Sequence, residues 1–194
     1  VPFCTLIIAI IIIPLYNLII IQIFCEVQMS IKITKMQGCG NDFVIIDYEE
    51  FQKMNCKMDN AARKLCDRNF GIGADGLIIP NVNVDNADIG WFFYNSDGTT
   101  AQMCGNGMRC FAKYVYDKKL VNKKEFTVKT LAGIITPKIL ENGQIRVNMS
   151  KPILETEKIP FLPNKNLNYK ISVKNRIFEG NAISMGNPHF VIFN

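Results

Sequence analysis

The chain has 194 residues, which is enough for one sizeable domain or two small ones. Its net charge of +5 is scattered, and basic residues do not alternate with aromatic ones, which argues against a nucleic-acid-binding face. The seven cysteines are odd in number and irregularly spaced, so we expect free thiols in a reducing compartment rather than a disulfide framework. With a single histidine and no C-x-x-C pair, we expect no metal site.

Residues 3–25 are apolar and long enough to span a bilayer, which takes about 20 residues. The segment has no basic flank, no clear cleavage site and no initial Met. Met29 stands just before the first predicted strand, and we expect residues 1–28 to be an artefact of a reading frame extended upstream of a start there. The mature protein is then expected in the cytoplasm, or in a plastid if the source is a plant. A membrane anchor is the alternative interpretation of this extension.

Two strands are predicted next, a half-buried one over residues 31–36 and another over residues 43–47. The tight turn between them presents Asn41, either outward or in hydrogen bonds of its own turn. Asp59 is predicted to cap a helix over residues 60–68. Residues 71–76 match the dinucleotide pattern G-x-G-x-x-G. However, a helix precedes this match and a strand follows it, the reverse of the order in that motif, so we expect no nucleotide cofactor.

The central stretch, residues 95–110, follows a predicted buried strand at residues 91–94 and leads into a helix. Cys104 lies at the start of this helix, where unpaired N–H groups and the helix dipole favour a thiolate and also bind a carboxylate. Such a thiolate suits attack on a carbonyl, or removal of a proton from the carbon next to a carboxylate. Attack on a carbonyl would require a histidine that activates the thiol, and the chain has only His189. A packed, unreactive cysteine is the third interpretation, and it is the one favoured for Cys110.

The remainder of the chain shows short alternating runs typical of strands, at residues 126–130, 134–139, 144–149, 169–173, 177–184 and 189–193. Gly133, Asn142-Gly143 and Gly180-Asn181 are turn signals, with Asn142-Gly143 the strongest hairpin signal. Pro152, Pro160 and Pro163 suggest a linker between two lobes. The predicted class is α+β, with curved, mostly antiparallel sheets wrapped around a central helix. We place a first lobe at residues 29–150 and the start of a second at residues 151–194.

Three blocks, at residues 36–43, 95–109 and 185–189, resemble the signature blocks of the diaminopimelate epimerase family, in that family's order. The resemblance runs from about Met29 to Asn194. It implies two pseudo-symmetric lobes with the site between them, the second lobe being incomplete here. It also implies a cofactor-independent isomerase that interconverts LL- and meso-2,6-diaminopimelate on the route to lysine and peptidoglycan, with a homodimer as the candidate assembly. Its partner would be this small molecule, with no nucleic acid and no membrane.

The resemblance also assigns roles to individual residues. Cys104 looks like one of two cysteines that move a proton on opposite faces of the substrate carbon. Seven residues resemble site residues of the family: catalytic Cys104, substrate-binding Asn41, Asn95, Gly105, Asn106 and Asn187, and His189 as a group that tunes the pKa of the cysteines. The second cysteine and a Glu-Arg pair would lie beyond Asn194, so we expect half a site and no activity from this chain.

Two positions depart from the family pattern. Thr99 replaces the usual Ser but keeps the hydroxyl, and Gly76 stands where some members carry a substrate-contacting Gln. That contact is therefore expected to be lost. Two other interpretations of the whole chain remain: an isomerase of the same fold that resembles proline racemase, or the inactive product of a decayed gene.

Overall fold

The computed structural model describes residues 31–149, 151–185 and 187–193. The chain divides into two units, Val1–Ser30 and Ile31–Asn194, and the described residues all belong to the second. The apolar segment of residues 1–28 lies outside them, so its interpretation as an artefact or an anchor stays a prediction. Within the described ranges, no helix is both long enough and apolar enough to cross a membrane.

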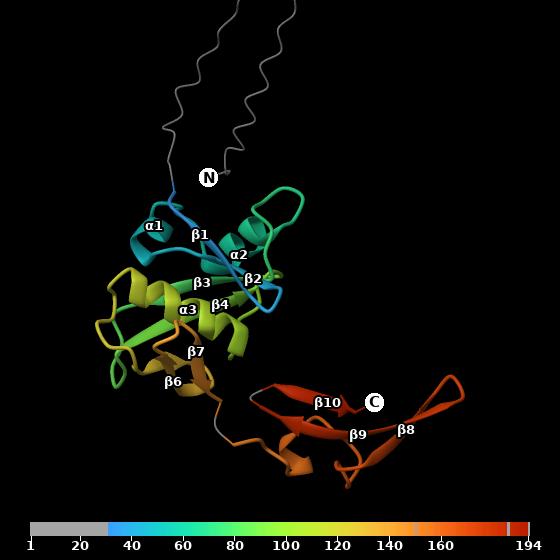
Figure 1. The fold of residues 1–194 in the computed structure, drawn as a ribbon. Helices are drawn as coiled ribbons and strands as arrows, with labels where there is room; N and C mark the ends of the chain where they lie inside the picture. Colours follow the sequence, from blue (N-terminus) through green and yellow to red (C-terminus); the bar gives the residue numbers. More distant parts are fainter. Residues whose placement is uncertain (1–30, 150, 186, 194) are drawn as a thin grey trace, which may run out of the picture. The chain divides into compact units, whose positions relative to one another are not determined.

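A sheet of seven strands forms the larger part of this unit, and its strands lie side by side in sequence order (Figure 1). They are β1 (Thr34–Gly38), β2 (Asn41–Ile45), β3 (Gly76–Asn81), β4 (Ile89–Asn95), β5 (Val128–Thr130), β6 (Gly133–Ile139) and β7 (Ile145–Asn148). The β2–β3 and β4–β5 pairs are parallel, and the other neighbours are antiparallel. The predicted α+β class with a mostly antiparallel sheet is confirmed.

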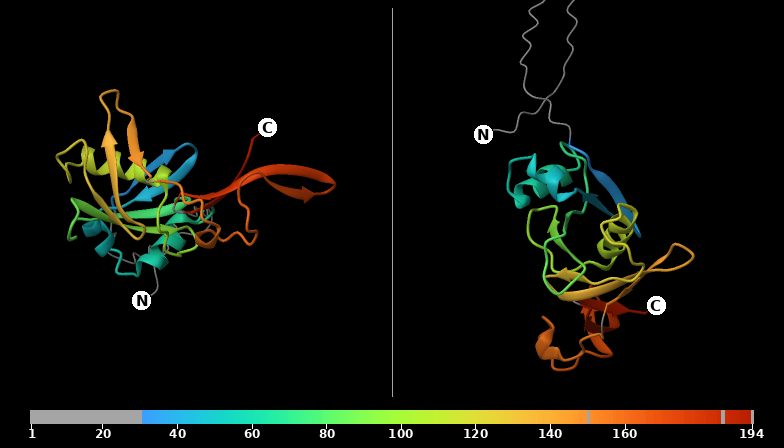
Figure 2. Two further views of the ribbon diagram at one scale, coloured as in Figure 1. Left: turned by 90° about the horizontal axis from the view of Figure 1, so that it is seen from below. Right: turned by 90° about the vertical axis from the view of Figure 1, so that its left-hand side faces the viewer.

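The sheet carries a separate core on each face, because side chains alternate along a strand. Phe43, Ile45 and Ile78 point to the face covered by α3 (Gly105–Asp117). Val44 and Leu77 point to the other face, where α1 (Tyr48–Gln52) and α2 (Met58–Cys66) pack. The helix α3 contacts the first strand, β1, and the last, β7, so the sheet curls around it, as Figure 2 shows from two further directions.

The central helix is held by an apolar stripe. Met108, Phe111, Ala112 and Val115 recur at the spacing of one helix face, and all four are completely buried. Burying a large apolar side chain contributes about 1.5–3 kcal/mol, so this stripe fixes α3 firmly in the curl of the sheet. The helix begins after Cys104 and ends before Lys118, which confirms the predicted start.

A second sheet contains three antiparallel strands in the order β10-β9-β8. They are β8 (Tyr169–Val173), β9 (Arg176–Ser184) and β10 (Pro188–Ile192). The proline-containing segment before them includes a short 3-10 helix, η1 (Thr156–Lys158), and Ile153 forms an isolated bridge with Ser184. This part of the chain buries few apolar side chains and leaves Leu162, Ile177 and Phe193 largely exposed.

Two local predictions are wrong. Asp59 does not cap α2, because the helix starts earlier, after Lys57; Asp59 lies in its first turn and pairs with Arg63. Gly180 and Asn181 lie inside β9 rather than in a turn, and the ring of Phe190 occupies the space where a Cβ of Gly180 would be. The turn between β8 and β9 is made instead by Lys174 and Asn175, both with positive φ.

The strongest hairpin signal is confirmed. Asn142 and Gly143 lie in the turn between β6 and β7, and Gly143 has a φ of 80°. The side chain of Asn142 accepts a hydrogen bond from the backbone N–H of Gln144, which supports the turn.

Candidate active site

All seven predicted site residues line a single pocket of about 440 Å³. They come from the start of β2, the end of β4, the start of α3 and the segment around the start of β10. The rest of its wall consists of Asp75 and six apolar side chains: Phe43, Phe93, Ala101, Met103, Met149 and Met185. Residues that are far apart in sequence thus meet around one thiol, although their roles stay predictions.

Cys104 is the N-cap of α3, and its side chain is half-buried. Its sulfur accepts a hydrogen bond from the backbone N–H of Gly107 at 3.4 Å, and its thiol donates to the side-chain oxygen of Asn41, also at 3.4 Å. The first bond favours a thiolate, and the second requires a thiol. The surroundings of this sulfur therefore supply a partner for each protonation state, as a group that takes up and returns a proton needs.

Glycines allow the start of α3 to approach the sheet closely enough for this contact. A Cβ on Gly107 would lie 3.3 Å from the ring of Phe43, and a Cβ on Gly38 would lie 3.1 Å from the backbone oxygen of Asn106. Larger residues at either position would push the helix away from the β1–β2 turn. The glycines of the motif thus bring Asn41 next to Cys104.

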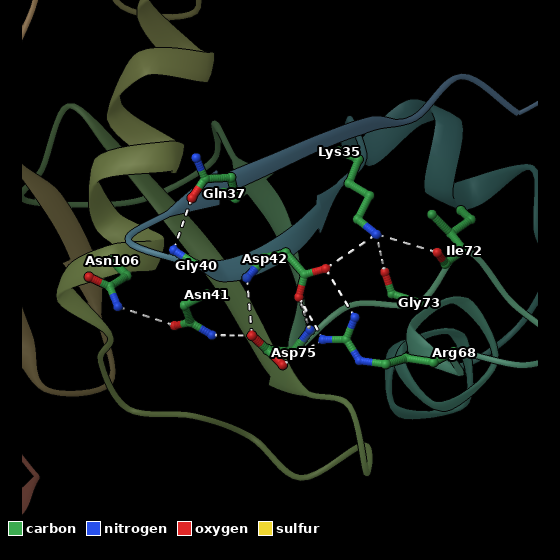
Figure 3. Close-up of polar contacts among 10 residues, drawn as sticks. All are labelled: Lys35, Gln37, Gly40, Asn41, Asp42, Arg68, Ile72, Gly73, Asp75 and Asn106. Carbon is green, nitrogen blue, oxygen red and sulfur yellow. Dashed lines mark hydrogen bonds and ion pairs between the residues drawn. The ribbon is translucent and has the colours of Figure 1, made fainter.

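Asn41 is tied to a cluster of charged side chains on its other side (Figure 3). Its amide nitrogen donates to the carboxylate of Asp75, which also accepts from the backbone N–H of Asp42 at 3.1 Å. Arg68 donates to both carboxylates, at 2.8 Å to each. The hydrogen bonds from Arg68, together with Lys35 at 3.2 Å, hold the pKa of Asp42 well below its usual range.

This charged cluster was not predicted from the sequence. Asp75 lines the pocket, yet it lies in the G-x-G-x-x-G stretch, whose sequence pattern indicates only a nucleotide motif. Its contacts with Asn41 and Asp42 join residues more than 30 positions apart, so no local pattern reports them. The available signal was the acidic residue directly after Asn41, which needs a cation when it is half-buried.

The side chain of Asn106 is fixed by Arg109, which lies one turn further along α3. The guanidinium donates to the side-chain oxygen of Asn106 and also contacts the sulfur of the exposed Cys39 at 3.2 Å. The amide nitrogen of Asn106 points to the side-chain oxygen of Asn41 at 3.5 Å, the long end of hydrogen-bond range. Arg109 belongs to the block at residues 95–109, and the resemblance of that block assigns it no role.

Asn95 is fixed by its own turn, where its amide nitrogen donates to the hydroxyl of Thr99 at 2.9 Å. That hydroxyl donates in turn to Asp97 at 2.6 Å. Thr99, which stands where the family usually has Ser, therefore provides the hydroxyl that orients Asn95.

His189 and Asn187 form the side of the pocket that belongs to the second sheet. The Nε2 atom of His189 lies 3.0 Å from the side-chain oxygen of Asn187. The structure thus places both residues at the pocket, and the tuning role of His189 stays a prediction.

Gly76 has no room for a side chain in this structure. A Cβ there would lie 2.7 Å from the backbone oxygen of Tyr94 and 2.9 Å from the ring of Phe93. The position is buried at the start of β3, so the contact that Gln makes in some family members has no equivalent at this residue.

Of the described residues that line the pocket, Cys104 is the one cysteine. Cys66 and Cys110 are buried in the two cores; burial raises the pKa of Cys66 to about 11 and also raises that of Cys110. Cys39 is exposed and Cys56 half-buried, and all five of these thiols are free. Among the described residues, no group of three histidine, cysteine or acidic side chains gathers as a metal site would require.

A second cavity, of about 390 Å³, lies along β4 next to Trp91, Tyr94 and Lys129. Its lining contains no cysteine and no histidine, and it holds none of the predicted residues. The pocket at Cys104 holds all seven predicted residues and is the candidate active site.

Two solved structures that share this fold are described as a hydroxyproline epimerase and a probable proline racemase. The chain matches a hydroxyproline epimerase from Agrobacterium vitis with a TM-score of 0.58 at 9% identity, covering 82% of this chain and 50% of that one. It matches a probable proline racemase from Agrobacterium radiobacter with a TM-score of 0.58 at 12% identity, covering 84% and 52%. At such low identity these matches establish the fold alone.

Sequence comparison is more specific. Residues 33–155 match the family model described as diaminopimelate epimerase, and the chain belongs to that family. It is 46% identical to the diaminopimelate epimerase of Desulforapulum autotrophicum over 173 residues, 85% of this chain and 61% of the relative. It is 46% identical to that of Carboxydothermus hydrogenoformans over 161 residues, 82% of this chain and 58% of the relative. The chain thus spans about three fifths of the length of these curated relatives.

Proposed function

We propose that this chain carries one half of the active site of a diaminopimelate epimerase, with Cys104 as the acid/base on one face of the reacting carbon. The observation that supports this most directly is the pocket itself. Residues from three separate sequence blocks line it around one thiol, which lies at a helix start. That placement suits a reaction that needs an anion-binding site and a proton acceptor side by side.

The proton transfer follows from this arrangement. The Cys104 thiolate removes the proton from the carbon next to a substrate carboxylate, and the electron pair left on the carbon spreads into that carboxylate. Backbone N–H groups of Gly105 and Asn106, in the first turn of α3, stabilise the charge that develops on the carboxylate. Inversion is completed when a second group donates a proton to the opposite face, and family resemblance assigns that step to another cysteine.

The substrate class follows from the rest of the pocket. A 2,6-diamino dicarboxylate carries two ammonium and two carboxylate groups. Asn41, Asn95, Asn106 and Asn187 offer neutral amides that pair with either kind of charge without leaving an unpaired ion in the pocket. The names of the relatives agree with this substrate class. We also propose a cytoplasmic location, supported by the five free thiols of the described residues.

A chimera tests the proposal. Residues 31–193 of this chain replace the matching part of the Carboxydothermus hydrogenoformans relative, which supplies the remainder of its own sequence. We expect the chimera to interconvert LL- and meso-diaminopimelate in D2O with deuterium incorporated at the inverted carbon. Cys104→Ala should reduce this rate by several orders of magnitude, as loss of a whole catalytic group does.

The matched control is Cys56→Ala, which removes another half-buried thiol that does not line the pocket. This variant should retain the rate of the chimera. If Cys104→Ala also retains it, Cys104 is a packing residue and the proposal is wrong. Turnover of L-proline in place of diaminopimelate would instead support the alternative that resembles proline racemase.

A further inference from the structure

A side-chain amide has a donor end and an acceptor end, and its neighbours decide which end faces which way. Two pocket amides, Asn41 and Asn106, each have a charged neighbour that tolerates one orientation only. Arg109 can only donate, and it contacts the oxygen of Asn106. Asp75, when ionised, can only accept, and it contacts the nitrogen of Asn41.

Between these ends the two amides face each other, with the nitrogen of Asn106 toward the oxygen of Asn41 at 3.5 Å. Figure 3 shows this row from Asn106 through Asn41 to Asp75. Reversing either amide would place like ends together, N–H against guanidinium or oxygen against carboxylate. We propose that Asp75 and Arg109 are positioning residues that fix both amides, so that the oxygen of Asn41 faces the thiol of Cys104.

Asp75 is itself held in place. The guanidinium of Arg68 donates to one of its oxygens at 2.8 Å, and the backbone N–H of Asp42 donates to the other at 3.1 Å. The carboxylate therefore has fixed partners on both sides and presents its remaining acceptor capacity to Asn41.

The orientation of Asn41 decides what the sulfur of Cys104 meets. In the structure the sulfur has one donor, the N–H of Gly107, and one acceptor, the oxygen of Asn41 at 3.4 Å. A reversed Asn41 would give it two donors, which favours the thiolate and disfavours the protonated form. The fixed amide thus keeps Cys104 able to hold the proton that it removes. This use in the reaction rests on the proposed function, whereas the orientation itself does not.

The test measures the reactivity of Cys104 in the full chain, without substrate. The rate of alkylation by iodoacetamide is followed against pH by mass spectrometry of the peptide that contains Cys104. In Asp75→Ala, Asn41 is free to turn its nitrogen toward the sulfur. We expect alkylation at pH 7 to be about two- to tenfold faster, the factor that one neutral hydrogen bond supplies, and the half-maximal rate to be reached at lower pH.

A double-mutant cycle separates orientation from simple loss of negative charge. In an Asn41→Ala background there is no amide to turn, so Asp75→Ala should no longer change the rate. Equal acceleration in both backgrounds would mean that the Asp75 charge acts through space, and no acceleration in either would mean that it does not act on the thiol. Both results overturn the proposal. The other charged or titratable side chain that lines this pocket, His189, is the same in all four proteins.

Two controls accompany the cycle. Arg68→Ala removes the ion pair between Arg68 and Asp75, while the backbone N–H of Asp42 still holds the Asp75 carboxylate against Asn41, so alkylation of Cys104 should stay unchanged. The buried Cys66 and Cys110 report unfolding in the same digest. If Asp75→Ala exposes them, the double-mutant cycle is measured with Asp75→Asn instead.

A second cycle of the same kind combines Arg109→Met with Asn106→Ala. The effect of Arg109→Met on the alkylation rate of Cys104 should vanish in the Asn106→Ala background. If the chimera does not epimerise diaminopimelate but the double-mutant cycle gives the expected result, the proposed function is rejected and the positioning role stands.

Discussion

The hydroxyl of Tyr114 donates to a carboxylate oxygen of Asp47 at 2.8 Å, which joins the central helix to the segment that leaves β2. Tyr114 is 5% exposed, so its polar end needs this partner inside the protein. Burial, together with the hydrogen bond to Asp47, raises the pKa of Tyr114 above its ordinary value. The contact holds α3 against the sheet at the end opposite Cys104.

We expect Tyr114→Phe to lower the free energy of unfolding by about 1–2 kcal/mol, because it leaves the half-buried Asp47 without this donor. Urea unfolding of the single variants and of the Tyr114→Phe/Asp47→Ala double variant measures the coupling between the two side chains. A double variant whose loss equals the sum of the single losses would show that the pair does not interact.

Acid should remove the stabilisation that the charged cluster supplies. Because Arg68 and Lys35 hold the folded-state pKa of Asp42 below its unfolded value of about 3.9, the unfolded chain takes up the proton first as pH falls. The contribution is therefore complete above about pH 4 and declines below it. Asp42→Asn should be less stable than the unmodified protein at pH 7, with the difference shrinking toward pH 2.5. Urea titrations at several pH values check this, and a difference independent of pH would contradict it.

Gly76→Gln should not restore the substrate contact that a Gln at this position makes in some family members. Its Cβ would meet the backbone oxygen of Tyr94 at 2.7 Å, so we expect a loss of stability of about 1–3 kcal/mol from overpacking. Thermal melting measures this. Gly105→Ala is the control, because a Cβ there meets only Met149 at 3.5 Å and should be tolerated. An unchanged melting temperature for Gly76→Gln would show that β4 moves aside easily.

The thiols should differ sharply in reactivity in the folded protein. Cys39 and Cys104 are at least partly accessible and should be alkylated readily at pH 8, whereas Cys66 and Cys110 should react only after unfolding. Burial raises the pKa of both of these buried thiols, so at this pH they stay protonated as well as covered. Peptide mass spectrometry before and after addition of urea compares the four. Equal labelling of Cys110 in the native protein would show that the core around α3 opens.

The 194-residue chain by itself should show no measurable stereoinversion of diaminopimelate. Among the described residues that line the pocket, Cys104 is the one thiol, so the opposite face of the substrate has no cysteine to donate a proton. Chiral chromatography after incubation of LL- and meso-isomers in D2O measures this. Inversion at a substantial rate, retained after purification of the chain to homogeneity, would mean that another group donates the second proton.

Local patterns predicted most of the fold. Strand alternation, the Asn142-Gly143 turn and the apolar stripe of α3 act over a few residues, so the sequence displays them directly. The wrong predictions occur where contacts with residues distant in sequence determine the local structure. Gly180 looks like a turn residue, but the ring of Phe190 on the neighbouring strand requires a glycine within β9.

The site was predicted in a different way, through the resemblance of three short blocks. The contact between Asp75 and Asn41 spans 34 positions, and the contact between Asn41 and Cys104 spans 63. No local sequence pattern therefore reveals either contact. The resemblance named the residues that line the pocket, and the structure adds the charged residues behind them. The contacts of Arg68 and Asp75 behind the pocket form only in the folded chain, where β2 and β3 pair in parallel.

The strand order of the larger sheet has a consequence for synthesis on the ribosome. Each strand from β2 to β7 pairs with the strand made just before it, so every pairing closes a short or moderate loop and none waits for a distant partner. The growing chain can add strands one at a time and enclose α3 when β6 and β7 emerge. The wall of the pocket from Asn41 to Met149 can thus be in place while residues 151–193 are still being translated.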